Sequence, residues 1–186
     1  MREPRSPSWF IALSILPGTW YSALPSPPPS IQCTHPEDLH CTVVFLGTVS
    51  EHAAYSAWDA LVWPLPTLAL TLGPVIPLGN PSHYSALGAT LAHPRERIER
   101  AMASVRDPVC EAAAIPPERR DPLAHITLAR PHRRASDHDR AAGLAWAQAL
   151  TLDAITVTPT QLALYTHHPT RTSHEAHYLA VQTRDL

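Results

Sequence analysis

The sequence contains two strand-like segments of the same pattern, Leu39-His-Cys-Thr-Val-Val-Phe-Leu-Gly47 and Ala124-His-Ile-Thr-Leu-Ala-Arg130. Side chains alternate between the two faces of a strand, so a histidine and a threonine two residues apart point the same way and their apolar neighbours point the other way. Each segment therefore predicts a strand with one buried face and with an imidazole and a hydroxyl on the other face. If the two strands meet, His40, Thr42, His125 and Thr127 surround one small site.

The His-x-Thr pattern is not rare in this chain, because 12 of its residues are histidine. A third copy stands at His168-Pro-Thr170, where the proline and the polar residues that follow predict a turn. Only His40 and His125 open aliphatic strands, one in each half of the chain. From the residues alone, a catalytic pair and two structural histidines remain equally open interpretations.

The length of the chain fits one domain over residues 1–186 or two closely packed lobes, and each half of the chain contributes one His-x-Thr strand. A chain of 186 residues that is 45% hydrophobic can bury a sizeable core. The 21 prolines predict short, frequently interrupted elements. All 14 basic residues are arginine, and 16 acidic residues outweigh them, which argues against a protein that coats RNA or DNA. A small anion or the end of a strand remains possible as a ligand.

The cysteines and the apolar segments indicate a cytoplasmic protein without a membrane span. Cys33, Cys41 and Cys110 form no Cys-x-x-Cys pair and are expected to be free thiols in a reducing compartment. No apolar stretch approaches the roughly 20 residues that a membrane helix needs. The apolar run from Trp9 to Leu16 follows two arginines, as a signal peptide would, but its eight residues favour a first strand.

Hydrophobic spacing and turn residues predict the remaining elements. The proline segment from Pro25 to Ser30 is expected to be an extended connector. Strands are predicted at residues 39–46, 67–72, 83–91, 124–130, 152–157, 161–166 and 177–182, and helices at 51–63, 94–105 and 137–150. Residues 74–81 are expected to form turns and residues 107–122 an irregular, proline-rich segment.

The two motifs, together with Leu162-Ala-Leu-Tyr165 and Tyr178-Leu-Ala-Val181, resemble the two-histidine (2H) phosphoesterases. Within that superfamily the sequence looks most like the LigT-like RNA 2',3'-cyclic phosphodiesterases, also called 2'-5' RNA ligases. The resemblance implies an α+β fold that is bilobal and pseudo-symmetric, with two antiparallel β-sheets flanked by helices and a central cleft. It also implies hydrolysis of a 2',3'-cyclic phosphate at an RNA end to a 2'-phosphate, and weak 2'-5' RNA ligase activity as a possible side reaction.

The resemblance assigns roles to the motif residues. His40 would be the general acid and His125 the general base, whereas sequence alone leaves the two roles interchangeable. Thr42 and Thr127 would donate hydrogen bonds to the phosphate. Arg130 is a further candidate phosphate ligand, although strict alternation turns it away from the His125 face unless the strand ends near Ala129. A solvated arginine is the equally weighted alternative.

The same residues bear on other ligands and functions. We expect no cofactor and no metal, because neither His-Glu-x-x-His nor a Cys/His set with ligand spacing is present. Tyr165 and Tyr178 are expected to pack in the core, with stacking on a nucleobase as the alternative. We expect a monomer that acts on an RNA end. The alternatives are a small cyclic nucleotide or ADP-ribose cyclic phosphate as substrate, a non-catalytic nucleotide-binding module, and a histidine-rich metal-storage protein.

Overall fold

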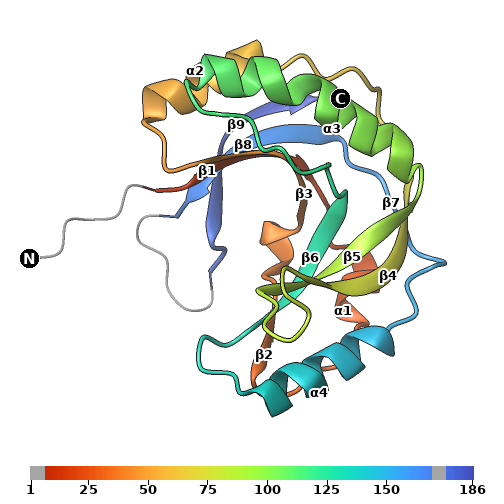
Figure 1. The fold of residues 1–186 in the computed structure, drawn as a ribbon. Helices are drawn as coiled ribbons and strands as arrows, with labels where there is room; N and C mark the ends of the chain where they lie inside the picture. The colour runs from red at the N-terminus through yellow and green to blue at the C-terminus, as the bar shows by residue number, and fades with distance from the viewer. Residues whose placement is uncertain (1–6, 169–174) are drawn as a thin grey trace, which may run out of the picture.

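Antiparallel strands form one strongly curled sheet in the computed structural model, which describes residues 7–168 and 175–186 (Figure 1). The strands are β1 (Trp9–Ser14), β2 (Ile31–Cys33), β3 (His40–Gly47), β4 (Leu70–Leu78), β5 (Ala86–His93), β6 (His125–Pro131), β7 (Thr156–Val157), β8 (Gln161–His167) and β9 (Tyr178–Asp185). The α-helices are α1 (Gly18–Ser22), α2 (Glu51–Ala60), α3 (Arg95–Ala112) and α4 (Asp137–Gln148), and Pro36–Asp38 form a 3-10 turn. The predicted α+β class is confirmed.

The order of the strands divides the sheet into two halves. It runs β7-β4-β5-β6-β3-β1-β8-β9, and the short β2 pairs with β6. The first four strands form one half and the last four form the other, so the two expected sheets are joined into one. The junction lies between β3 and β6, where Cys41 pairs with Ile126. The two His-x-Thr strands are therefore neighbours at the centre of the molecule.

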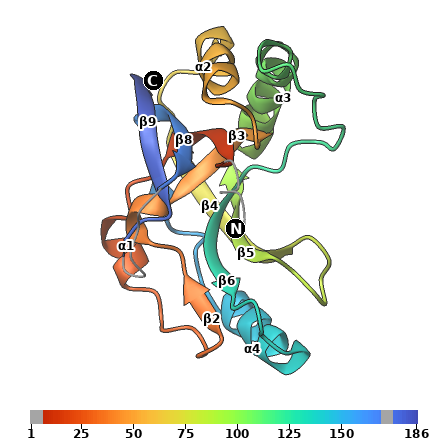
Figure 2. The same ribbon diagram turned by 90° about the vertical axis from the view of Figure 1, so that its left-hand side faces the viewer.

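Helices cover the sheet in two places (Figure 2). Helices α2 and α3 pack against each other and on strands β1, β3 and β5, while α4 packs on β2, β4 and β6. Cys41 and Ile126 are fully buried in the main hydrophobic core, which also contains Trp58 of α2 and Ile98 of α3. Burial of the Cys41 and Ile126 face fixes the register of both strands, because a slip by one residue would turn the histidines into the core.

The first strand is confirmed as β1, which lies between β3 and β8 in the interior of the sheet. Its apolar run is needed there, since Ile11 and Ala12 are fully buried. The expected connector from Pro25 to Ser30 contains no helix, but the short helix α1 precedes it and was not predicted. Among the described residues, no helix is both long and apolar enough to cross a membrane. Of the third His-x-Thr copy, residues 169–170 lie outside the described residues.

Two predicted interruptions are wrong. Helix α3 runs to Ala112 through Pro108, although we expected an irregular segment from residue 107. Val105 and Val109 continue its buried stripe on both sides of the proline, so burial outweighs the loss of one helical hydrogen bond. Strand β4 likewise runs through residues 74–78, which were expected to form turns. It pairs with β7 only at Leu70 and Thr71, so the prolines further along need no donor on that side.

Candidate active site

The pairing of β3 with β6 places all four motif residues on one face of the sheet. Cys41 lies opposite Ile126, and both point into the core. The same antiparallel register sets His40 beside Thr127 and Thr42 beside His125, on the other face. The two imidazoles and the two hydroxyls thus lie around the junction of the two halves. His40, Thr42 and His125 are half-buried, and Thr127 is 9% exposed.

Each imidazole is held by the carbonyl group two residues before it in the chain. The Nδ1 atom of His40 lies 2.6 Å from the carbonyl oxygen of Asp38, and Nδ1 of His125 lies 2.7 Å from that of Leu123. A carbonyl oxygen can only accept a hydrogen bond, so Nδ1 carries the hydrogen in both rings. The other ring nitrogen, Nε2, is then the atom that can take up or give a proton. Both histidines have the tautomer that acid/base chemistry at Nε2 requires.

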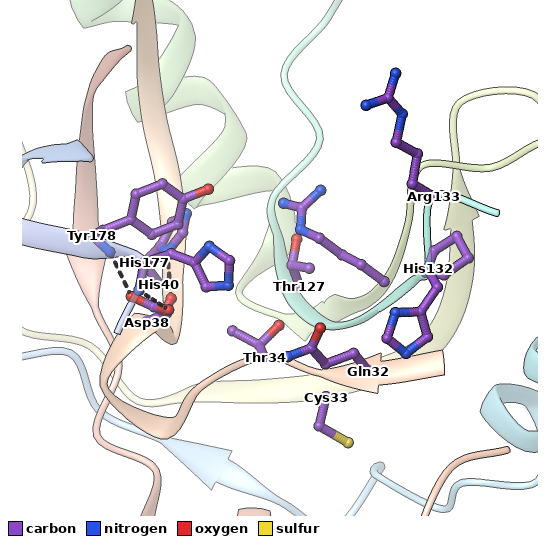
Figure 3. A pocket seen from close by; sticks show the side chains of 12 residues that line it. Gln32, Cys33, Thr34, Asp38, His40, Thr127, His132, Arg133, His177 and Tyr178 are labelled. Carbon is purple, nitrogen blue, oxygen red and sulfur yellow. Dashed lines mark hydrogen bonds between the residues drawn. The ribbon is translucent and has the colours of Figure 1, made fainter. Parts of the chain in front are cut away.

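A cavity of about 400 Å³ adjoins this junction (Figure 3). His40, Thr127 and Arg130 line it, whereas His125 and Thr42 are not among its lining residues. Nine further residues line the cavity, and the sequence analysis considered a site role for one of them, Tyr178, as a stacking surface for a nucleobase. They are Gln32, Cys33 and Thr34 of β2 and its end, Asp38, Pro131, His132 and Arg133 beyond Arg130, and His177 with Tyr178 at the start of β9. Strand β2 was not predicted, because a strand of three residues beside a proline segment leaves no periodic signal.

Arg130 reaches the cavity because β6 contains a bulge. Gly88 of β5 pairs with Thr127, but the next residue of β5, Leu87, pairs with Ala129, so Leu128 is an extra residue in β6. A bulge shifts the alternation of side chains by one position. Arg130 therefore lies on the histidine face although the strand continues to Pro131. Our expectation that the strand had to end near Ala129 was wrong.

Solved structures share the fold of this protein over nearly the whole chain. A structure described as a phosphoesterase is 18% identical and has a TM-score of 0.69, and the match covers 97% of this chain and 98% of that one. Escherichia coli LigT complexed with 3'-AMP is 17% identical, with a TM-score of 0.69 and the same coverage. The protein TT0787 of Thermus thermophilus is 20% identical, with a TM-score of 0.67 and coverage of 96% and 97%.

The chain has the two-histidine phosphoesterase fold. No protein-family model matches the sequence, and a search of curated proteins found no match either. The likeness is thus one of three-dimensional structure rather than of overall sequence. It confirms the fold that the two motifs implied.

Asp38 lines the cavity beside His40, and sequence reasoning gave it no role. Its side chain is 2% exposed, and its two carboxylate oxygens accept hydrogen bonds from the backbone N–H groups of His177, at 2.7 Å, and Tyr178, at 3.0 Å (Figure 3). Its backbone carbonyl holds His40. One residue thus connects the start of β3 to the start of β9 and orients an imidazole between them. An aspartate two residues before the histidine was the only signal in the sequence.

Aromatic rings surround His40 on the side away from His125. The ring centre of Phe10 lies 4.7 Å from that of His40, that of Tyr178 lies 5.6 Å away in an edge-on arrangement, and that of Tyr165 lies 5.8 Å away. Tyr165 is buried, and its hydroxyl lies 2.7 Å from Oγ of Ser14, so the predicted core packing is confirmed for this residue. Tyr178 is half-buried and lines the cavity.

Burial lowers the pKa of both histidines below the ordinary value. The pKa of His40 falls to about 4, mainly through desolvation, with smaller contributions from the positive charges of Arg130 and His125. Desolvation also lowers the pKa of His125, and Arg130 adds to that shift. In both rings the carbonyl partner of Nδ1 acts in the opposite direction. Without an anion in the site, both imidazoles are neutral at pH 7.

The described residues contain no group of three or more histidine, cysteine, aspartate or glutamate side chains that could hold a metal ion. The described residues that line the cavity offer an anion the hydroxyl groups of Thr34 and Thr127 and the guanidinium groups of Arg130 and Arg133. Hydroxyl and guanidinium donors suit a phosphate.

Proposed function

We propose that the protein hydrolyses a 2',3'-cyclic phosphate at an RNA end to a 2'-phosphate, without a metal. The observation that carries this proposal is the matched pair of imidazoles. Each has Nδ1–H held by a carbonyl group and Nε2 left for proton transfer, and the two lie on neighbouring strands. Hydrolysis of a cyclic phosphodiester needs one proton taken from water and one given to the leaving oxygen, which two such groups can supply.

In the proposed reaction, Nε2 of neutral His125 removes a proton from a water molecule as the water oxygen forms a bond to phosphorus. The bond between phosphorus and the ribose 3' oxygen breaks, and Nε2–H of protonated His40 gives that oxygen its proton. These roles follow the family resemblance. The negative phosphate would raise the pKa of both rings, so the pair would take up the one proton that it needs from solvent when the substrate binds. Positioned acid and base groups contribute roughly 10²–10⁴-fold.

Thr42, Thr127 and Arg130 would stabilise the charge that develops on the phosphate oxygens. Thr127 and Arg130 line the cavity, and the register puts Thr42 on the same face beside His125. Donors fixed by the sheet need no reorganisation during the reaction. The structural likeness to a phosphoesterase, and to LigT complexed with 3'-AMP, supports a phosphate ester of a nucleotide as substrate.

The test is hydrolysis of a short RNA with a 2',3'-cyclic end. The wild type should open the ring, and His40→Ala and His125→Ala should each lose about 10²–10⁴-fold in kcat/KM. His52→Ala, which removes an exposed imidazole from α2, is the matched control and should retain full activity. Phosphorus NMR of the product separates a 2'-phosphate from a 3'-phosphate. If both histidine variants hydrolyse the RNA as the wild type does, the proposal is wrong.

A further inference from the structure

The arginines of the cavity all lie on one side of it. Of the lining residues, Arg130 and Arg133 are the two arginines, and both come from β6 and the turn that follows it. Figure 3 shows Arg133 and His132 across the cavity from Tyr178 and Asp38. Arg134 is the next residue of the turn and is also exposed. The positive charge at the opening of the cavity is therefore concentrated in the turn between β6 and α4.

These two turn arginines have no partner within the described part of the chain. No hydrogen bond or ion pair holds the side chain of Arg133 or Arg134 there. The nearby acidic residues at the start of α4 have other partners. The carboxylate of Asp139 accepts hydrogen bonds from the backbone and hydroxyl of Ser136, and that of Asp137 lies 3.5 Å from Nδ1 of His83. The guanidinium groups remain available to an external anion.

The size of the cavity limits how much of a substrate can enter it. At about 400 Å³ it is at the small end of the range for ligand cavities, which is roughly 300–1,000 Å³. Only the terminal nucleotide of an RNA strand fits, so the rest of the strand has to cross the rim. The opposite wall carries Asp38, whose carboxylate repels phosphate, and the aromatic ring of Tyr178. A phosphodiester backbone is favoured over the side that carries unpaired arginines.

We infer that the turn after β6 is a backbone-binding rim, in which Arg133 and Arg134 hold the phosphates that precede the cyclic end of an RNA strand. This inference rests on the proposed function and narrows it, because it makes a strand a better substrate than a cyclic mononucleotide. The rim contacts phosphates and therefore reads no base sequence. It also explains how a chain with a net charge of −2 can select a polyanion, since two local cations suffice at the mouth.

The experiment compares a short RNA ending in a 2',3'-cyclic phosphate with the matching 2',3'-cyclic mononucleotide, which has no second phosphate. The variant is Arg133→Ala/Arg134→Ala, and the control is Arg97→Ala, which removes an exposed arginine from α3. Exposed ion pairs are worth up to about fivefold each, so the ratio of kcat/KM for the strand to that for the mononucleotide should fall about tenfold in the variant. The ratio should not change in the control.

Salt dependence provides a second readout of the same interactions. The slope of log KM for the strand against log salt concentration should decrease in the variant by about 0.7 for each phosphate that the rim no longer neutralises. If both the ratio and the slope are unchanged in the variant, the inference that Arg133 and Arg134 bind the RNA backbone is wrong. If the wild type hydrolyses neither substrate, the proposed function fails. Fluorescence anisotropy of a labelled strand that ends in a 2'-phosphate then still tests the rim, because equal affinity of wild type and variant would refute it.

Discussion

Replacing the buried carboxylate of Asp38 should destabilise the protein and impair the site together. The carboxylate accepts two backbone hydrogen bonds, from His177 and Tyr178, across 139 and 140 residues of sequence. Hydrogen bonds to a charged group contribute roughly 1.5–3 kcal/mol each, so Asp38→Ala should lower the free energy of unfolding by about 3–6 kcal/mol. Asp38→Asn keeps one acceptor oxygen but turns an amide N–H toward the second donor. Its expected loss is about 2–3 kcal/mol.

Urea unfolding measures these values, with Asp59→Asn as the control because Asp59 is exposed on α2 and should change stability by less than about 0.5 kcal/mol. In the folded Asp38→Asn variant, the carbonyl group that holds His40 is still present. The loss of kcat/KM should therefore be about tenfold, through displaced Tyr178, and smaller than that of His40→Ala. A loss of less than about 1 kcal/mol in Asp38→Ala would refute the argument that this carboxylate joins β3 to β9.

Four further predictions concern the histidines, the need for a metal and a phosphate ligand. The pKa of His40 is about 4, that of His125 is also below 6.5, and the pair must hold one proton for the reaction. In a profile measured from pH 4 to 9, kcat/KM should therefore be greatest below pH 6.5 and should decline as rising pH removes that proton. Gly88→Ala would place a methyl group 3.1 Å from Cδ2 of His125 and 2.9 Å from Cδ1 of Leu78. The methyl group would displace the His125 imidazole, so kcat should fall several-fold, and unfolding of the variant is measured in parallel. Hydrolysis should be unchanged in EDTA, and its abolition by EDTA would contradict the metal-free mechanism. Arg130→Ala should raise KM about tenfold, because it removes a guanidinium donor to the phosphate.

The sequence predicted what depends on periodicity within one strand. The aliphatic segments after His40 and His125 are strands, and their polar residues share a face because the side-chain period of a strand is two. The neighbouring position of the two strands could not be read from periodicity, and it entered only through the family resemblance. The spacing of residues thus predicted the two strands, and the family resemblance predicted that they lie side by side.

The remaining features depend on contacts between distant segments. The bulge at Leu128 exists only relative to β5, so no pattern within β6 could show that Arg130 faces the cavity. The bonds of Asp38 join residues that are far apart in sequence. Helix α3 continues past Pro108 because its apolar residues on both sides of the proline are buried. The stabilisation from that burial outweighs the unfavourable helix propensity of proline. Local rules failed at these positions because packing partners decided them.

The two motifs repeat in geometry but not in environment, and the difference bears on the chemistry. Both imidazoles use Nδ1 in the same way. His40, however, stands among Phe10, Tyr165 and Tyr178, whereas His125 lies against Gly88. Desolvation is the largest cause of the lowered pKa of both rings, and it takes the pKa of His40 to about 4. The two imidazoles titrate as a coupled pair, so a change beside one ring shifts the proton that the pair holds. Replacing Phe10 by leucine should therefore raise the pKa of His40 and move the pH optimum upward, an effect that NMR titration of the imidazoles can measure.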